Sequence, residues 1–140
     1  SWRIVCTMND QDRNLLFALS HALMRRFAFV HVDSPEEDLF TALLSGPGSA
    51  VRDLLPLREF QELGPAVFID ARDYVAVRLR DGARPSLALL EAFTAYFLPQ
   101  LDRLDAVRHR RLLDLTDRIF EPMEQTAVRR LVEPLRLIPG

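Results

Sequence analysis

Asn9 and the arginine pair Arg25 and Arg26 are the residues whose types and positions could do chemistry. Asn9 follows an apolar, strand-like run at residues 4–8, and sites in α/β proteins form at the carboxyl ends of strands. Its neutral amide can orient a water molecule or hold an anionic oxygen without acting as a nucleophile. A guanidinium can neutralise negative charge that develops during phosphoryl transfer. Asparagine also caps turns, and arginines also end helices as solvated charges, so a purely structural role is the alternative for each.

The elements expected around these residues form a strand, a short helix and a second strand. A polar turn follows the strand at residues 9–14, and Ser20 can cap a helical segment over residues 21–24. Residues 27–32, FAFVHV, are apolar on both faces, as in the covered strand of a parallel sheet. Arg25 and Arg26 would therefore lie between the helix and the second strand.

This order resembles the second half of an AAA+ nucleotidase core, most closely the dynein-related branch with its MoxR-like proteins and McrB-type restriction GTPases. The residues that carry the resemblance are Thr7, Met8, Asn9, Asp12, Arg13, Ala22, Leu23, Arg25, Arg26 and Phe27. The resemblance implies that Asn9 is sensor 1 and that Arg26, with Arg25, forms the arginine finger. For Asp12 and Arg13 two roles stay open, an ion pair that fixes the turn or contact of Arg13 with an interface phosphate.

The sequence contains no phosphate-binding loop. All 18 basic residues are arginine, and no G-x-x-x-x-G-K-[ST] string occurs. If the resemblance holds, the chain is a fragment, and the half of the core that binds the nucleotide phosphates lies upstream of Ser1. The complete parent would then use ATP or GTP with Mg²⁺, whereas the fragment alone would hydrolyse nothing. The resemblance further implies a ring of identical subunits, in the parent a hexamer, that acts on an unknown client or effector protein.

Composition sets the remaining limits on function. The 140 residues are 49% hydrophobic, enough for a real core, and the net charge of −2 gives the whole chain no electrostatic bias towards nucleic acid. The single Cys6 excludes an intrachain disulfide and favours the cytoplasm. No signal peptide is visible, and the longest apolar stretch, residues 87–98, is too short to span a membrane. The three histidines lie far apart without cysteine or carboxylate at ligand spacing, so no metal site is expected.

After the core strands the pattern is helical. The fold class expected is mainly α: a core remnant at 1–33, a helical lid at 34–104 and a C-terminal helical extension at 105–140. Ser34 and Pro35 predict the start of a helix that Gly46 ends. Further helices are expected over 50–63, with a break at Pro56, over 66–79, where a strand also fits, and over 86–98. Asp105 is expected to cap another helix, whose inward residues are Val107, Leu112, Leu115 and Ile119. A last helix is expected to begin at Pro122.

Two groups of arginines remain in the helical part. Arg72 falls where the AAA+ resemblance places the sensor 2 helix, and it is the only arginine of that helix's first two turns. A second cluster could bind an acidic protein or nucleic acid, which gives a second hypothesis, a non-catalytic helical interaction module. Its members are Arg108, His109, Arg110 and Arg111, with Arg103 and Arg118. Interleaved aspartates instead favour a mixed, solvated face: Asp102, Asp105, Asp114 and Asp117.

Overall fold

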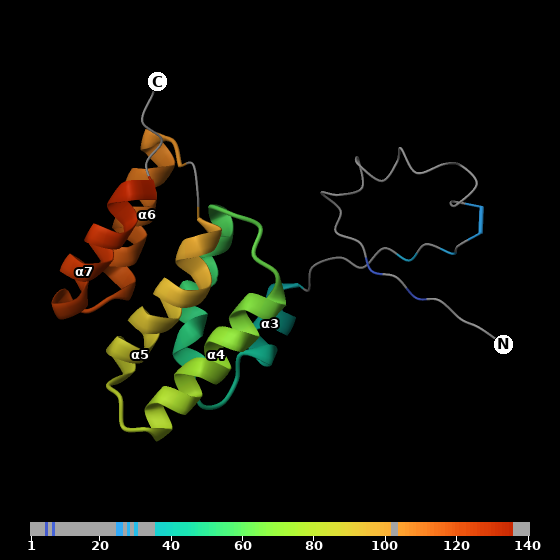
Figure 1. The fold of residues 1–140 in the computed structure, drawn as a ribbon, viewed down its shortest axis with the longest axis horizontal. Coiled ribbons are helices and arrows are strands. Elements are labelled where there is room, and N and C mark those ends of the chain that lie inside the picture. The colour runs from blue at the N-terminus through green and yellow to red at the C-terminus, as the bar shows by residue number, and fades with distance from the viewer. Residues whose placement is uncertain are drawn as a thin grey trace. The chain divides into compact units, whose positions relative to one another are not determined.

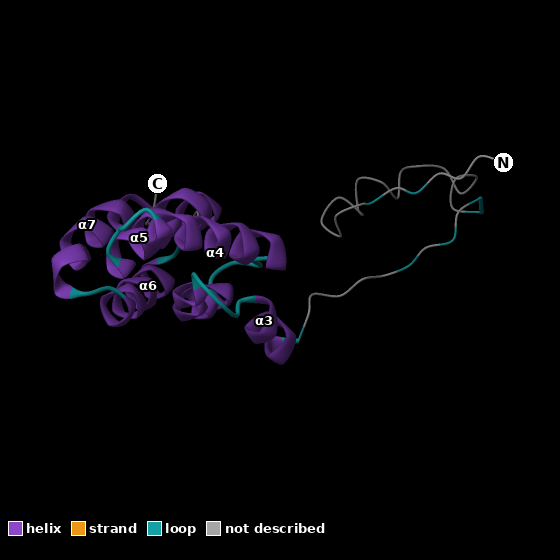
Figure 2. Cartoon of the chain, turned by 90° about the horizontal axis from the view of Figure 1, so that it is seen from below, coloured by secondary structure: helices purple, strands orange, loops and turns teal. Residues whose placement is uncertain are grey.

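The chain consists of two compact units, residues 1–33 and residues 34–140, in a computed structural model. The structure describes residues 36–101 and 104–135, together with the single positions 5, 7, 25, 26, 28 and 30. The described part is mainly helical, and no strand occurs in it (Figure 1, Figure 2). The strands expected over 4–8 and 27–32 and the helical segment over 21–24 lie for the most part outside the described residues. Two described positions of those expected strands, Val5 and Val30, are 91% and 84% exposed.

The helical unit begins with α3 (Glu37–Leu43), which confirms the helix expected before Gly46. Its expected capping residues, Ser34 and Pro35, lie outside the described residues. Gly46 and Gly48 then turn the chain, with φ angles of +88° and +86°. A Cβ on Gly48 would stand 2.2 Å from the carbonyl oxygen of Arg72, so only glycine fits this crossing.

The next element, η2 (Ser49–Glu59), confirms a helix in this segment; it is a 3-10 helix, and the break expected at Pro56 is wrong. Pro56 lies inside the helix on its exposed side. A 3-10 helix has about three residues per turn, so every third side chain lies on one face. The buried residues follow that period through the helix and beyond it: Val51, Leu54, Leu57, Phe60 and Leu63.

Two long helical segments form the middle of the unit. α4 (Pro65–Arg80) confirms the helix that alternation at residues 75–79 had left ambiguous with a strand. α5 (Pro85–Ala92) continues without a break into the π-helix η3 (Phe93–Phe97) and the 3-10 helix η4 (Leu98–Gln100). Proline takes the first helical position in both α4 and α5, where its missing N–H costs nothing.

The C-terminal part holds α6 (Ala106–Ile119), α7 (Pro122–Val132) and the 3-10 turn η5 (Glu133–Leu135). The Asp105 cap is confirmed, because its carboxylate accepts hydrogen bonds from the backbone N–H groups of Val107 and Arg108 at 2.9 and 2.8 Å. The inward assignment of Val107 is wrong: it is 70% exposed, and His109 is buried instead. The core-facing stripe of α6 therefore starts one half-turn later than expected, at His109, and continues through Leu112 and Leu115.

All of these helices share one core. Figure 2 shows α4, α5 and α7 in one layer, with α3 and α6 in the other. η2 packs against α4, α5 and α6 and so joins the layers. Edge-to-face aromatic contacts link Phe68 to Phe40 and to Phe97, with ring centroids 5.5 and 4.9 Å apart. Phe93 meets Phe120 at 5.4 Å, so the helices after residue 105 belong to the same packed body as those before it.

Candidate functional site

The arginine pair expected to act in phosphoryl transfer lies in a turn. Arg25 and Arg26 are both exposed there. The other residues that the sequence singled out in this unit, Asn9, Asp12 and Arg13, lie outside the described residues. The geometry that would join them to the pair therefore stays a prediction.

Arg72, the candidate sensor 2 residue, is engaged within the helical unit. It lies midway along α4, and its Nη1 donates a hydrogen bond to the carbonyl oxygen of Leu43 at the end of α3. Its Nε and Nη2 donate to Oδ1 of Asp73 at 2.9 and 2.6 Å. The guanidinium thus ties α4 to the C-terminus of α3.

Arg72 is one of several side chains that bind the last carbonyl groups of a helix. The final carbonyls of a helix have no partner within it and need outside donors. Arg52 donates to the carbonyl oxygen of Thr41 in α3 at 2.6 Å, and Arg108 donates to that of Phe60 at the end of η2. At the other end of the unit, Gln125 Nε2 donates to the Asp117 carbonyl at 2.9 Å, and His109 Nε2 lies 3.1 Å from the carbonyl oxygen of Val132. Each contact joins two different elements of the helical unit.

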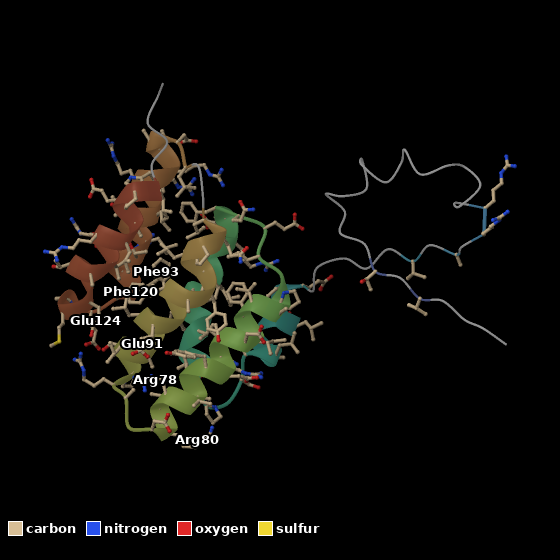
Figure 3. The ribbon with its side chains drawn as sticks, viewed as in Figure 1. Arg78, Arg80, Glu91, Phe93, Phe120 and Glu124 are labelled. Carbon is tan, nitrogen blue, oxygen red and sulfur yellow. The ribbon has the colours of Figure 1, made fainter. Side chains whose placement is uncertain are left out.

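A charged cluster between α4 and α5 centres on Glu91. Figure 3 labels Arg78 and Glu91, and Arg78 donates to both carboxylate oxygens, at 2.7 and 3.1 Å. The Tyr74 hydroxyl donates to Oε2 at 3.0 Å. The hydrogen bonds from Arg78 lower the pKa of Glu91 against the opposing effect of burial. Burial, and next the hydrogen bond to Glu91, raises the pKa of Tyr74. The cluster holds the two longest helical segments together by charge as well as by packing.

Glu124 is the buried carboxylate of the described core, and sequence reasoning missed it. Its side chain is 4% exposed, in the first turn of α7. Oε1 accepts hydrogen bonds from Ser86 Oγ at 3.0 Å and from Arg84 Nη2 at 3.2 Å, both residues standing at the start of α5. Oε2 is buried without a partner. Its signal in the sequence is weak, because a glutamate in the first turn of a helix is ordinarily exposed.

Arginines of α6 and α7 form ion pairs with acidic residues of η2 and α6. Arg111 pairs with Glu59 at 3.0 Å, and Arg129 pairs with Asp117. An open hollow of about 400 Å³ lies nearby, lined by Arg58, Glu59, Glu62 and Leu63. Its arginine is engaged already, since the Arg58 guanidinium lies over the ring of Phe40 at 4.2 Å.

Metal-binding clusters and membrane-spanning helices are both absent from the described residues. No group of three or more histidine, cysteine, aspartate and glutamate side chains is placed to hold a metal ion there. Among the helices described, none combines the length and the apolar character needed to cross a membrane. Comparisons of the chain with known protein families, with curated proteins and with solved structures find no match.

Proposed function

We propose that this chain is the C-terminal part of an AAA+ NTPase subunit of the dynein-related branch, with sensor 1, an arginine finger and the helical lid. The observation that carries the proposal is the order of Thr7, Met8 and Asn9, then Arg25, Arg26 and Phe27, at the spacing of that branch. The exposed turn at the arginine pair supports it, since a finger must project from its own subunit. A helical unit beginning directly after residue 33 supports the assignment of a lid.

The proposed chemistry divides between two subunits. Asn9 acts in cis, where its amide holds the attacking water or an oxygen of the γ-phosphate. Arg26 acts in trans on a neighbour's nucleotide and neutralises the charge that spreads over the γ-phosphate oxygens in the transition state. Arg25 braces Arg26 or binds a further phosphate oxygen. An arginine finger of this kind contributes about three to five orders of magnitude in rate in GTPases.

The proposal assigns nucleotide and Mg²⁺ binding to another part of the parent protein. The described residues hold no cluster suited to a metal ion, and the sequence has no lysine for a phosphate loop. The isolated chain should accordingly neither bind nor hydrolyse ATP or GTP. Arg72 stays the candidate sensor 2 residue, a role that requires its guanidinium to leave the Leu43 carbonyl and Asp73.

The alternative function, a helical module that binds an acidic protein or nucleic acid, would use the arginines of α6. Two of these are already engaged, Arg108 with the Phe60 carbonyl and Arg111 with Glu59. Phosphate contacts would make such binding steeply dependent on salt. We expect no steep salt dependence for the isolated chain, and its observation would favour the module over the NTPase.

The test is a mixing experiment on the full-length parent. One subunit carries a defective phosphate loop and keeps Arg26, and the other carries Arg26→Ala and keeps the phosphate loop. Each alone should be inactive, and the mixture should recover single-turnover hydrolysis because the intact Arg26 reaches the neighbour's nucleotide. Arg80→Ala removes an exposed arginine of the helical unit and serves as the control. This variant should hydrolyse nucleotide without being mixed with a second variant. Mixtures that assemble but stay inactive would overturn the trans role.

A further inference from the structure

The first helix after residue 33, α3, is held to the helical unit by arginine side chains as well as by apolar packing. We infer that α3 is a latch, a segment that undocks and redocks by itself while the rest of the helical unit stays folded. Its undocking frees three arginine side chains from their contacts with α3. The inference is independent of nucleotide chemistry, and it rests on the shortness of α3, on the side chains that hold it and on the turn that follows it.

α3 is too short to be stable by itself. It has 7 residues, and isolated helices of fewer than about 12–15 residues are marginal in water. Its N-cap residue, Glu36, makes no capping hydrogen bond with its side chain. Phe40 and the C-cap residue Leu44 anchor it in the core, whereas Leu39 is 53% exposed. The helical form of α3 therefore depends on docking.

Two arginines from neighbouring elements hold the C-terminal end of the docked helix. Arg52 of η2 donates to the carbonyl oxygen of Thr41 at 2.6 Å, and Arg72 of α4 donates to that of Leu43. Both carbonyl groups belong to the last turn of α3, where carbonyls lack partners within the helix. These contacts exist only while α3 is docked.

The side chain of Phe40 completes the attachment. Its ring meets that of Phe68 edge to face at 5.5 Å, and the Arg58 guanidinium lies over it at 4.2 Å. When α3 leaves, Arg58 loses its aromatic partner as Arg52 and Arg72 lose their carbonyl acceptors. The undocking of one short helix thus changes the surroundings of three guanidinium groups together.

The turn after α3 provides a hinge at Gly46. Its φ is +88°, and a Cβ added there would meet no atom within 4 Å, so the chain has room to rotate. Gly48 is fixed by contrast, because a Cβ there would stand 2.2 Å from the carbonyl oxygen of Arg72. Rotation about the N–Cα bond of Gly46 would move α3 but leave in place the Gly46 carbonyl, which accepts a hydrogen bond from the Ser49 N–H at 3.1 Å. The moving segment therefore ends at Gly46.

The position of α3 in the chain gives the latch a role in regulation. The first unit ends at Asp33, and α3 is the first described helix after it. A force carried along the chain from the first unit therefore reaches α3 before any other described helix. The latch connects the state of the first unit with the availability of three guanidinium groups in the second.

Hydrogen exchange of the isotope-labelled full chain, followed by NMR in urea below the unfolding transition, tests the latch. The amide groups of residues 40–44 should be protected at least about tenfold less than those of residues 71–75 in α4. Their exchange should hardly depend on urea, because a local opening exposes little surface. Exchange within α4 should rise steeply with urea, because it requires unfolding of the whole unit.

Substitution of the two arginines that bind carbonyls should loosen the latch. Arg52→Ala and Arg72→Ala should each speed exchange of residues 40–44 about tenfold, still with little dependence on urea, because each removes a charged donor. Arg80→Ala, at an exposed position of α4, is the matched control and should change nothing. In Arg72→Ala, modification of Arg52 and Arg58 by phenylglyoxal, mapped by mass spectrometry, should also speed up.

Three results would overturn the inference. The first is equal protection and equal urea dependence for residues 40–44 and 71–75, which would show that α3 opens only with the whole unit. The second is unchanged exchange of α3 in both arginine variants. The third is faster exchange of α3 in Arg72→Ala without faster modification of Arg52 and Arg58. If a variant does not fold, the unsubstituted chain still decides the first point.

Discussion

Arg25 and Arg26 in the first unit differ in their surroundings from three arginines of the helical unit. Arg25 and Arg26 are exposed in a turn. Arg52, Arg72 and Arg108 instead donate to main-chain carbonyl groups at the ends of α3 and η2. A guanidinium has several donors in a fixed plane and stays charged at any relevant pH, so it serves both as a cap for carbonyls and as a partner for phosphate.

The difference shows what decides the role of an arginine in a chain without lysine. Where a helix C-terminus lies within reach, its unpaired carbonyls accept the donors, and the arginine becomes part of the fold. An arginine that is exposed in a turn, as Arg25 and Arg26 are, keeps its guanidinium in contact with solvent. Substitutions in the two regions should therefore separate activity from stability.

The largest effect should come from Arg26→Ala. In the full-length parent it should lower hydrolysis by about three to five orders of magnitude, because the developing phosphate charge loses its partner. Nucleotide affinity should change little, and the unfolding free energy should stay within about 0.5 kcal/mol, since Arg26 is exposed. Single-turnover hydrolysis, nucleotide titration and urea unfolding measure the three quantities. Parallel loss of nucleotide binding and hydrolysis would contradict the role given to Arg26.

Arg72→Ala should give the opposite result, a loss of stability. Its removal leaves the Leu43 carbonyl without its donor and frees Asp73, which should cost about 1–2 kcal/mol. Arg80→Ala is the matched control in the same helix, and its exposed side chain should contribute no more than about 0.5 kcal/mol. Urea unfolding of the isolated chain compares the two. Equal midpoints would show that the contact with Leu43 does not stabilise the fold.

Local signals in the sequence predict much of the helical unit. Asp105 caps α6, and Pro122 begins α7, because a cap or an N-terminal proline acts within one turn of the chain. η2 lies where a helix is expected, but its 3-10 type was missed although the signal is present. Its apolar residues recur every third position from Val51 to Leu63, which fits a 3-10 helix better than an α-helix, but such helices are rarely this long.

The residues that tie elements together could not be read from the sequence. Arg72 and Leu43 are 29 positions apart, and Glu124 and Ser86 are 38 apart, so only the tertiary packing brings them into contact. Asn9 and Arg26 could be singled out because a resemblance assigns roles by order and spacing. Their roles stay predictions, since Asn9 lies outside the described residues and Arg26 is described only as part of an exposed turn.

The smallest predicted effect concerns the pH dependence of the α4–α5 cluster. Hydrogen bonds from Arg78 hold the pKa of Glu91 below its usual value of 4.5 in the folded chain. A carboxyl group with a lowered folded pKa stabilises the fold above its unfolded pKa, and this contribution is lost as the pH falls through the folded pKa. The Glu91→Gln variant should therefore be less stable than the unsubstituted chain at neutral pH. Below about pH 4.5 its stability should fall less steeply with decreasing pH than that of the unsubstituted chain.

Urea midpoints measured from neutral to acidic pH test this expectation. The same substitution at Glu62, which is exposed, should leave the pH dependence of the unsubstituted chain in place. The side chains of Glu91 and Arg78 are 30% and 32% exposed, so solvent screens their attraction. The change in the slope of stability against pH should therefore be small. A slope for Glu91→Gln identical to that of the unsubstituted chain would mean that apolar packing, such as the contact of Phe68 with Phe97, and not this charge cluster, holds α4 against the α5–η3 segment.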